Sequence, residues 1–244
     1  MNIEAKEKNI TLDGRLSCAA SLVRNDSVVA DIGTDHAYLP IYLLSRGTAK
    51  FAIASDVNRG PLDRAVAHAE EYGMTDRMRF TLADGLCGIE PEKEGVTDIV
   101  ICGMGGELIA KIIGASDYTK KSGVRLILQP MTCAAELREF LAENGYEIVT
   151  ERLCKAAGKI YTCIAAEYDG QKRNFDAVEL LLGTHHIAAH DPLFRDFASS
   201  FAQKYETKIN GLKTGGHDTS ADEAVLYKLK KLIAESEDFS DECN

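Results

Sequence analysis

The chain has 244 residues, of which 45% are hydrophobic and 27% charged, and it carries a formal net charge of −10 at pH 7. These fractions are typical of a globular protein with room for one α/β domain and a smaller appendage. The net charge argues against a surface uniformly adapted to polyanions, so a nucleic-acid partner would need a local basic face. No apolar run approaches the ~20 residues of a membrane span, and the N-terminal stretch lacks a signal-peptide pattern. We therefore expect a cytoplasmic protein that makes no membrane contact.

Seven cysteines are spread through the chain, and no two of them are closer in sequence than nine residues. This spacing excludes CxxC-type metal or redox motifs and disfavours a disulfide framework. Most of the cysteines stand in apolar runs, where cysteine behaves as a small hydrophobic residue. We predict structural cysteines and no metal site.

An amphipathic helix is expected at residues 12–24, followed by five buried strands that alternate with helices. The strands are expected at 28–32, 51–57, 79–85, 98–106 and 124–130, and the intervening or following helices at 40–46, 60–71, 107–113 and 134–143. Each strand ends in a polar or glycine-rich turn, and in a parallel sheet these turns meet at the carboxyl edge, where ligands bind.

Two further strands, at 146–153 and 159–168, are separated only by a short turn. Such a short connection requires an antiparallel pair, because a parallel crossover needs a dozen or more residues. Five parallel units finished by an antiparallel hairpin fit the seven-stranded, Rossmann-like sheet of class I methyltransferases. We predict this α/β domain over residues 1–169.

The sequence after Tyr168 predicts helices only. After a polar linker, helices are expected at 175–182, 192–212 and 221–233, and the apolar spacing of the last two suits an antiparallel, coiled-coil-like hairpin. The stretch from Glu235 to Glu242 contains five acidic residues and no basic ones. We predict a second unit over residues 170–244, a helical extension with an acidic tail.

The turn after the first strand is the first candidate site. Gly33 would let backbone approach a ligand, and the carboxylates of Asp31 and Asp35 could accept hydrogen bonds from a cationic amino group. His36 adds an imidazole. The structural alternative is that Asp35 caps the following helix and that His36 is merely solvated.

Further polar groups follow the next strands. Asp56 ends the second strand at about the spacing that places a carboxylate on a ribose diol. Asp84-Gly85 ends the third strand and could bind an adenine amino group or simply form a turn. Three glycines within Gly103–Gly106 indicate close approach of a bulky ligand, because a tight turn alone would need only one.

Several blocks of sequence resemble the bacterial tRNA (adenine-22-N1)-methyltransferases, the TrmK family. These blocks are Asp31-Ile-Gly-Thr-Asp-His-Ala-Tyr-Leu-Pro40, Asn58-Arg-Gly-Pro61, Ala83-Asp-Gly-Leu86, Ile101-Cys-Gly-Met-Gly-Gly106 and Leu128-Gln-Pro130. The resemblance covers about residues 12–168, and the C-terminal helices match the family's extension in kind. Asp56 stands where many members carry Glu, and Met131 stands where Asn would be expected.

The resemblance implies S-adenosylmethionine as cofactor and tRNA as partner, with N1 of adenine attacking the sulfonium methyl group. Because methylation leaves a cationic base, we expect Asp35 and His36 as catalytic residues, Asp35 stabilising that charge and His36 acting as its partner or as a proton acceptor. Cofactor binding is expected at Asp31, Gly33, Thr34, Asp56, Val57, Asp84, Gly85, Gly103, Met104 and Gly105. RNA binding is expected at Arg15, Lys204, Lys208, Lys228 and Lys231, with Lys213 and Lys230 on the same helical platform. We expect a monomer or weak dimer.

Three other functions remain open on the sequence. A nicotinamide-dependent oxidoreductase would share the first two strands but would want glycines near positions 35 and 37. A small-molecule methyltransferase would share everything up to Tyr168 and would have no use for the helical extension. A non-catalytic binding module would not need the glycine loop.

Overall fold

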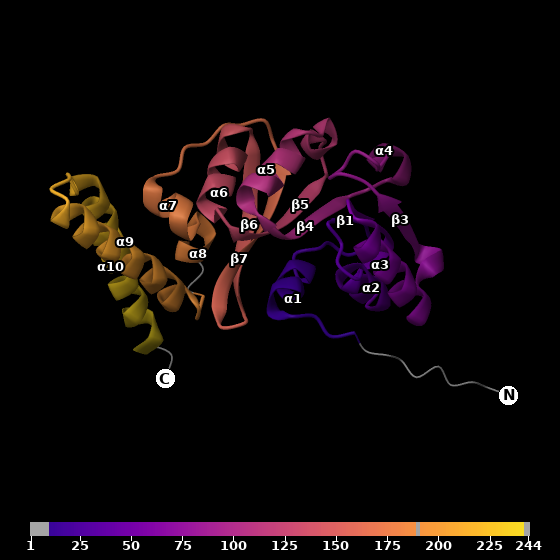
Figure 1. Cartoon of the computed structure of the whole chain (residues 1–244), viewed down its shortest axis with the longest axis horizontal. Coiled ribbons are helices and arrows are strands. Elements are labelled where there is room, and N and C mark those ends of the chain that lie inside the picture. Colours follow the sequence, from indigo (N-terminus) through magenta and orange to yellow (C-terminus); the bar gives the residue numbers. More distant parts are fainter. Residues whose placement is uncertain (1–9, 189–190, 242–244) are drawn as a thin grey trace.

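The computed structural model describes residues 10–188 and 191–241. Its centre is one seven-stranded sheet in the order β3-β2-β1-β4-β5-β7-β6 (Figure 1). The strands are β1 (Ser27–Ile32), β2 (Ala49–Asp56), β3 (Met78–Leu82), β4 (Asp98–Gly105), β5 (Arg125–Thr132), β6 (Tyr146–Ala156) and β7 (Lys159–Tyr168). The first five are parallel, and β7 runs antiparallel to both β5 and β6. This confirms the methyltransferase-type sheet that the sequence predicts.

Helices cover both faces of the sheet, and each face has its own apolar core. One core unites α1, α2 and α3 with side chains such as Val29 and Val100, and the other unites α5 and α6 with Ile99 and Leu126. The helices of this part are α1 (Gly14–Ala20), α2 (Tyr38–Ser45), α3 (Arg59–Glu71), α4 (Pro91–Glu94), α5 (Gly106–Gly114) and α6 (Ala134–Glu143), with single turns η1 (Thr75–Arg77) and η2 (Asp117–Lys120). The central strands β1, β2, β4 and β5 are buried on both faces over most of their length, which is why they read as continuous apolar runs.

Several element boundaries differ from the prediction. Helix α1 ends at Ala20 rather than near Arg24, because Arg24 pairs with the buried carboxylate of Asp98 at 2.7 Å and holds the chain out of the helix. Strand β3 ends at Leu82, so Asp84 and Gly85 lie in a loop. The sequence did not predict α4, α8 or the two η turns, which are too short to show a helical period.

The C-terminal helices build a third apolar cluster beside the outer strand β6. They are α7 (Ala177–Leu182), α8 (Thr184–Ala188), α9 (Phe194–Thr214) and α10 (Ser220–Asp241). The cluster includes Phe197 and Leu229 and takes in Leu153 of β6. Helices α9 and α10 lie side by side as an antiparallel hairpin at one end of the molecule (Figure 1). The division at residue 169 remains a prediction, and the acidic tail lies partly outside the described residues.

A buried polar network attaches α7 and α8 to the methyltransferase sheet. Arg138 of α6 and Glu151 of β6 form an ion pair of 2.7 Å, with side chains 1% and 0% exposed. Arg138 Nη1 also donates to the carbonyl oxygens of Leu180 and Leu181 at the end of α7. His186 of α8 contacts Thr162 Oγ1 at 2.8 Å, and burial together with the charge of Arg138 lowers the pKa of His186 to about 3. The network therefore uses a neutral imidazole and a single buried ion pair.

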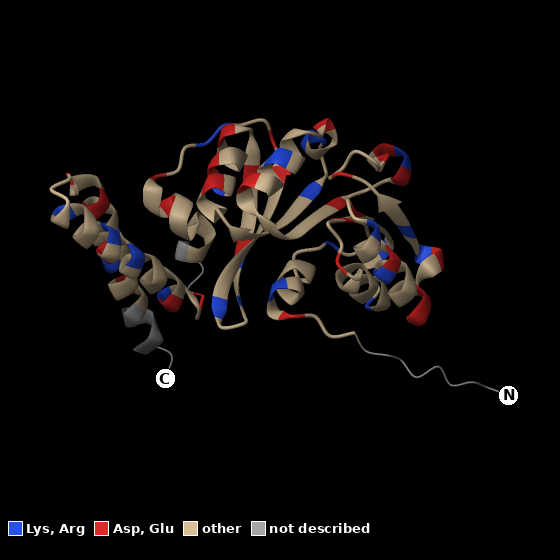
Figure 2. Ribbon diagram, viewed as in Figure 1, with Lys and Arg blue, Asp and Glu red and all other residues tan. Residues whose placement is uncertain are grey.

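Charges alternate along the helical hairpin, as the mixed blue and red of α9 and α10 in Figure 2 shows. Lys208 pairs with Asp222 at 2.8 Å, and Lys230 pairs with Glu206 at 2.7 Å across the two helices. Within the described part of the chain, no helix combines the length and the apolar character needed to cross a membrane.

Candidate active site

Two loops at the carboxyl edge of the sheet touch each other. A Cβ atom added to Gly33, after β1, would lie 2.0 Å from the methyl group of Met104, in the glycine loop of β4. Gly33 has φ of +76°, and its N–H donates to the Ser55 carbonyl of β2 at 2.8 Å. The predicted polar and glycine-rich loops are therefore neighbouring walls of one site.

A cavity of about 690 Å³ lies between these loops and helix α1. Eight of the residues predicted for the site or its rim line it: Arg15, Asp31, Gly33, Asp35, Asp56, Val57, Gly103 and Met104. Three other lining residues, Tyr38, Asn58 and Gln129, stand in the sequence blocks quoted for the resemblance, whereas the sequence did not single out Thr11, Asp13 or Leu16. A cavity of this size, lined by apolar side chains and a few carboxylates, is typical of a small-molecule or cofactor site.

Asp31 supplies the one fully desolvated carboxyl group of this cavity. Burial, with a further contribution from the nearby carboxylate of Asp56, raises the pKa of Asp31 to about 6. No lysine or arginine among the described residues pairs with it. A buried carboxylate of this kind gains most from a cationic ligand group, because the ligand charge replaces the lost hydration.

Asp56 and the following residues complete the β2 side of the cavity. The Asn58 N–H donates to Asp56 Oδ1 at 2.7 Å, which fixes the orientation of that carboxylate. The second oxygen is left for a ligand hydroxyl group, as expected for a ribose contact. Val57 is 60% exposed and lies beside it, so an apolar surface is available to a planar ligand.

The glycine loop is held in place by a buried amide. Gln129 of β5 is fully buried; its Oε1 accepts from the Gly103 N–H at 3.1 Å, and its Nε2 donates to the Pro130 carbonyl at 2.9 Å. Gly103 has φ of +77° and no atom within 4 Å of an added Cβ. The backbone of the loop therefore lines open space, as close approach by a ligand requires.

The glycines of this loop have separable roles, which substitution should reveal. A Cβ on Gly106 would lie 2.0 Å from the Cys133 carbonyl oxygen, a backbone atom. We expect Gly106→Ala to lower the free energy of unfolding by about 2–3 kcal/mol through overpacking. Gly103→Ala should cost about 1 kcal/mol of stability, from its positive φ, and should mainly weaken cofactor binding. Urea denaturation and calorimetric titration measure the two effects; equal stability losses would contradict this separation.

Asp35 and His36 form an exposed polar group at the cavity mouth. The side chain of Asp35 is 74% exposed, and its Oδ1 lies 3.2 Å from His36 Nε2 and 3.6 Å from a guanidinium nitrogen of Arg64. Arg64 Nε also lies 3.0 Å from His36 Nε2. Helix α2 has no side-chain cap, so the alternative that Asp35 caps it is wrong.

The backbone of this turn adopts an uncommon conformation. His36 and Ala37 both have positive φ, 61° and 54°, although neither is a glycine. Two such residues cost about 1–2 kcal/mol each. The turn stacks the His36 ring on Tyr38, with centroids 5.4 Å apart, and holds the His68 ring 5.2 Å away. Of these three rings, that of Tyr38 lines the cavity.

Some predicted site residues do not line the cavity. The side chain of Thr34 is buried behind the turn, and neither His36 nor Gly105 is among the described lining residues. Asp84 and Gly85 line a separate cavity of about 320 Å³ with Leu108 of α5. Their roles toward the cofactor remain predictions.

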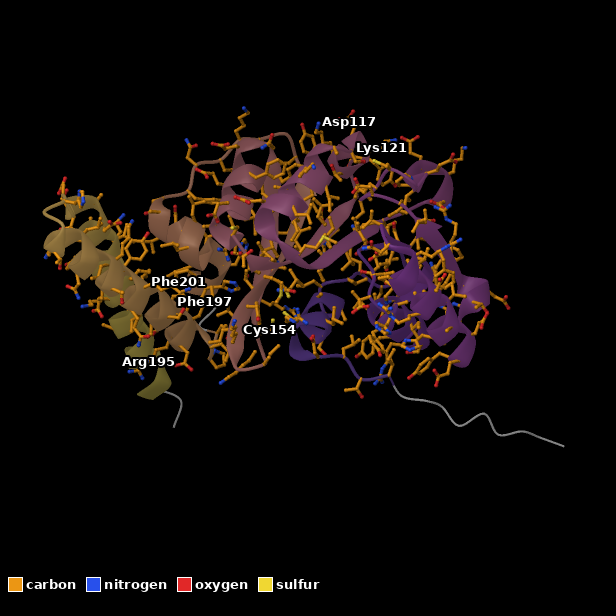
Figure 3. The ribbon with its side chains drawn as sticks, viewed as in Figure 1. Asp117, Lys121, Cys154, Arg195, Phe197 and Phe201 are labelled. Carbon is orange, nitrogen blue, oxygen red and sulfur yellow. The ribbon has the colours of Figure 1, made fainter. Side chains whose placement is uncertain are left out.

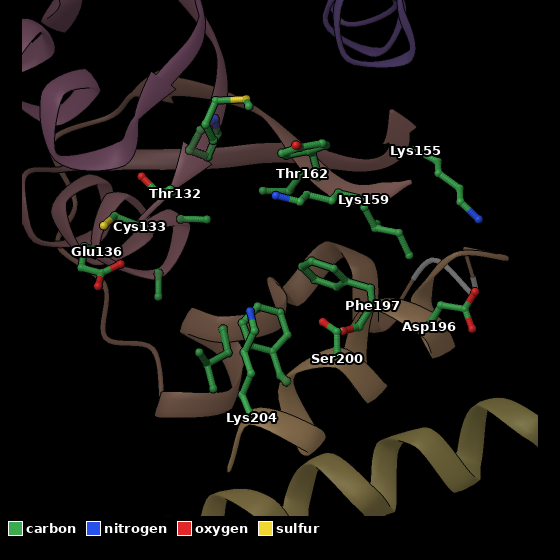
Figure 4. A pocket seen from close by; sticks show the side chains of 18 of the residues that line it. Thr132, Cys133, Glu136, Lys155, Lys159, Thr162, Asp196, Phe197, Ser200 and Lys204 are labelled. Atoms are coloured by element: carbon green, nitrogen blue, oxygen red, sulfur yellow. The ribbon is translucent and has the colours of Figure 1, made fainter. Parts of the chain in front are cut away.

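A groove of about 870 Å³ lies between the sheet and the helical extension (Figure 4). Strand β5 joins the two spaces, since Gln129 lines the cavity while Pro130 and Met131 line the groove. Arg15 Nη1 contacts Met131 Sδ at 3.0 Å at this junction. Met131, which stands where the family resemblance leads us to expect Asn, thus contacts Arg15 between the cavity and the groove.

Three lysines border the groove. Lys155 and Lys159 come from the β6–β7 hairpin, and Lys204 comes from α9, where its Nζ lies 5.0 Å from the centroid of the Phe201 ring. None of the three has a carboxylate partner among the described residues. Lys208, Lys228 and Lys231, by contrast, are paired with Asp222, Asp176 and Glu235. Sequence reasoning missed Lys155 and Lys159, because a hairpin turn gives no binding signal.

Comparison with known proteins supports a methyltransferase site. Residues 12–164 match the methyltransferase domain family model. A Bacillus subtilis (strain 168) protein named tRNA (adenine(22)-N(1))-methyltransferase is 37% identical over 71% of this chain and 72% of its own length.

Solved structures agree over nearly the whole chain. A Streptococcus pneumoniae putative tRNA (m1A22) methyltransferase in complex with S-adenosyl-L-methionine has a TM-score of 0.78 and 33% identity, covering 90% of this chain and 98% of that one. The Bacillus subtilis m1A22 tRNA methyltransferase TrmK has a TM-score of 0.77 and 29% identity, covering 93% and 99%. The chain belongs to the TrmK family of S-adenosylmethionine-dependent tRNA (adenine-22-N1)-methyltransferases.

Proposed function

We propose that this protein transfers the methyl group of S-adenosylmethionine to N1 of adenine 22 in tRNA, within the cavity between the β1 turn and the β4 glycine loop. The observation that carries the proposal is the contact between Gly33 and Met104, which joins the two loops around the buried carboxyl group of Asp31. The relatives described above carry out, or are named for, the same reaction.

The residues of the cavity fit the cofactor. Asp31 would accept from its ammonium group, Asp56 from its ribose hydroxyls, and the open backbone at Gly103 would lie against it. When bound, S-adenosylmethionine supplies a methyl group on a positively charged sulfur that is already a good leaving group. The protein's main contribution is then alignment and electrostatic stabilisation.

The mouth of the cavity suits the adenine. N1 has a free lone pair only when the base is unpaired or flipped out of its stack. Tyr38 offers a ring to such a base, and the carboxylate of Asp35 can accept a hydrogen bond from its exocyclic amino group. Methylation at N1 leaves a cationic base, which Asp35 would stabilise while Arg64 holds that carboxylate in position and also donates to His36 Nε2.

Asp35→Asn tests this role of the carboxylate. The amide keeps the shape of Asp35 but removes the negative charge that faces the methylated base. We expect kcat to fall by about 100-fold, in the range of the loss of one electrostatic stabiliser, with cofactor affinity nearly unchanged. Single-turnover methylation and calorimetric titration measure the two quantities. Full turnover by the variant would remove Asp35 from the mechanism.

The tRNA would lie along the groove between the sheet and α9. Lys155, Lys159 and Lys204 surround the groove without carboxylate partners among the described residues, so their charges are available to phosphates. The paired lysines of the hairpin would first have to give up their partners. The unpaired lysines therefore favour the groove, rather than the outer face of the hairpin, as the basic surface with which this acidic protein would bind tRNA.

Salt dependence distinguishes these two surfaces. Each phosphate contact contributes about 0.7–0.9 to the slope of log K against log salt concentration. Alanine at Lys155, Lys159 and Lys204 together should therefore reduce the slope for tRNA binding by about 2. The matched triple variant at Lys208, Lys228 and Lys230, also exposed, should change it much less. The opposite ranking would place the RNA on the hairpin.

The reaction itself is tested with two tRNA transcripts that differ only at position 22. We expect the purified protein and labelled S-adenosylmethionine to label the transcript with adenine 22, and nucleoside analysis to show 1-methyladenosine. The transcript with guanine 22 should stay unlabelled. Equal labelling of both transcripts would contradict adenine 22 as the methylated position, and cofactor binding without transfer to any tRNA would favour a small-molecule substrate.

A tRNA substrate agrees with a cytoplasmic enzyme. Sedimentation would test the predicted monomer or weak dimer.

A further inference from the structure

Three cysteines that are distant in the sequence meet beneath helix α1. Cys18 comes from α1, Cys154 from β6 and Cys163 from β7, and their sulfur atoms all lie within 4.8 Å of one another. Figure 3 marks Cys154 on the hairpin, close to α1. Cys154 and Cys163 are buried and Cys18 is half-buried. Linear spacing gave no sign of this cluster, so the prediction of no metal site never considered it.

The sulfur atoms are close to the geometry of a metal site. A metal at the centre of three sulfurs, with bonds of about 2.3 Å, needs sulfurs about 4.0 Å apart, so a contraction of about 0.8 Å or less suffices. The thiols now donate only long hydrogen bonds to backbone carbonyls: Cys18 to Arg152 at 3.8 Å, and Cys154 and Cys163 to Tyr161 and Arg15 at 3.7 Å. These weak contacts would cost little to exchange for bonds to a metal.

The cluster is accessible and has a nearby positive charge. A cavity of about 660 Å³ reaches Cys18 and is also lined by Gly14 and Arg152. Arg152 donates to Ser21 Oγ at 2.9 Å and has no carboxylate partner among the described residues. An ion can therefore reach the cluster from the side of Cys18.

We propose that Cys18, Cys154 and Cys163 form a trigonal three-thiolate site for a soft monovalent cation of the Cu(I) class. Among the described residues, no histidine, carboxylate or fourth cysteine joins the cluster, and a structural Zn²⁺ site needs four ligands. Soft thiolates select Cu(I). Binding forms three sulfur–copper bonds, releases three thiol protons to solvent and changes no oxidation state. The resulting charge of −2 lies beside Arg152.

The site would affect the first helix of the active site. Cys163 contacts the Arg15 carbonyl of α1, and α1 with its N-cap contributes Asp13, Arg15 and Leu16 to the cofactor cavity. A metal bound by α1, β6 and β7 would fix this helix to the hairpin. Because the ion would bind the folded state only, its binding should also raise the melting temperature.

The test is an anaerobic titration of the reduced, full-length protein with Cu(I) against a chromophoric Cu(I) chelator. We expect one equivalent to bind. Cys18→Ser should weaken binding by more than the ~10–100-fold that the loss of an outer-shell partner costs. Cys87→Ser, at an exposed cysteine outside the cluster, is the matched control and should bind like the wild type.

Stability and a second metal complete the test. Cu(I) should raise the melting temperature of the wild type but not that of Cys18→Ser. Without metal, the melting temperature and the cofactor affinity of Cys18→Ser should match those of the wild type, which would show that the variant folds. Unchanged copper binding by Cys18→Ser, or equal loss in Cys87→Ser, would overturn the site. Zn²⁺ binding as strong as Cu(I) binding would overturn the three-coordinate assignment. None of these readouts depends on methyl transfer.

Discussion

Asp31→Asn is expected to weaken S-adenosylmethionine binding by roughly 100-fold, about 3 kcal/mol, while the protein stays folded. Truncating one partner of a buried charge pair costs about 2–5 kcal/mol, and in the proposed complex the other partner would be the ligand's ammonium group. The folded protein should tolerate the change because burial disfavours the charge of Asp31 and no lysine or arginine among the described residues pairs with it. Calorimetric titration and thermal melting measure the two properties.

The pH dependence of binding provides the control for this variant. In the proposed complex the ammonium group would pair with the ionised carboxylate, and below pH 6 the free protein holds Asp31 largely protonated. Binding must then expel a proton, so Kd should rise about tenfold for each pH unit below 6 and stay level above 7. Asp31→Asn should bind weakly at every pH. A wild-type Kd that stays constant from pH 7 to 5 would show that Asp31 does not meet the ammonium group.

Arg138→Met is expected to destabilise the protein by about 3–5 kcal/mol. The change removes one partner of an ion pair whose two side chains are 1% and 0% exposed, and it leaves the carboxylate of Glu151 buried without its counter-charge. It also removes the donor to the carbonyls of Leu180 and Leu181, which ties α7 to α6. Urea denaturation measures the loss in the free energy of unfolding. Limited proteolysis should show the C-terminal helices being cleaved first.

The double variant Arg138→Met/Glu151→Leu separates charge burial from packing. Replacing a whole buried ion pair with apolar residues of similar volume is often neutral, so we expect it to regain most of the lost stability. Lys230→Met, which breaks an exposed pair with Glu206, should change stability by less than about 1 kcal/mol. A double variant no more stable than Arg138→Met would show that the hydrogen bonds to α7, rather than the unpaired charge, dominate.

Most of the fold could be predicted from the sequence. Apolar runs such as Val28 to Ile32 and Ile99 to Ile101 have few alternatives to buried parallel strands, and the short turn before Lys159 requires an antiparallel pair. The glycines at positions 33 and 103 also indicated the two loops of the site from the sequence. Both have a positive φ, which other residues adopt only at a cost in free energy.

The amino-acid sequence by itself determined the five parallel strands and their antiparallel end, the carboxyl edge as the ligand edge, and the residues that end each strand there. Only the tertiary structure decided which of these residues share a cavity: it placed Asp84 apart, brought Lys155 and Lys159 to the groove, paired the hairpin lysines with acids and gathered three distant cysteines. The physical reason is the range of the interactions. Strand and turn preferences act between neighbours along the chain, whereas a cavity, an ion pair or a thiol cluster depends on side chains that meet only after the helices pack on the sheet.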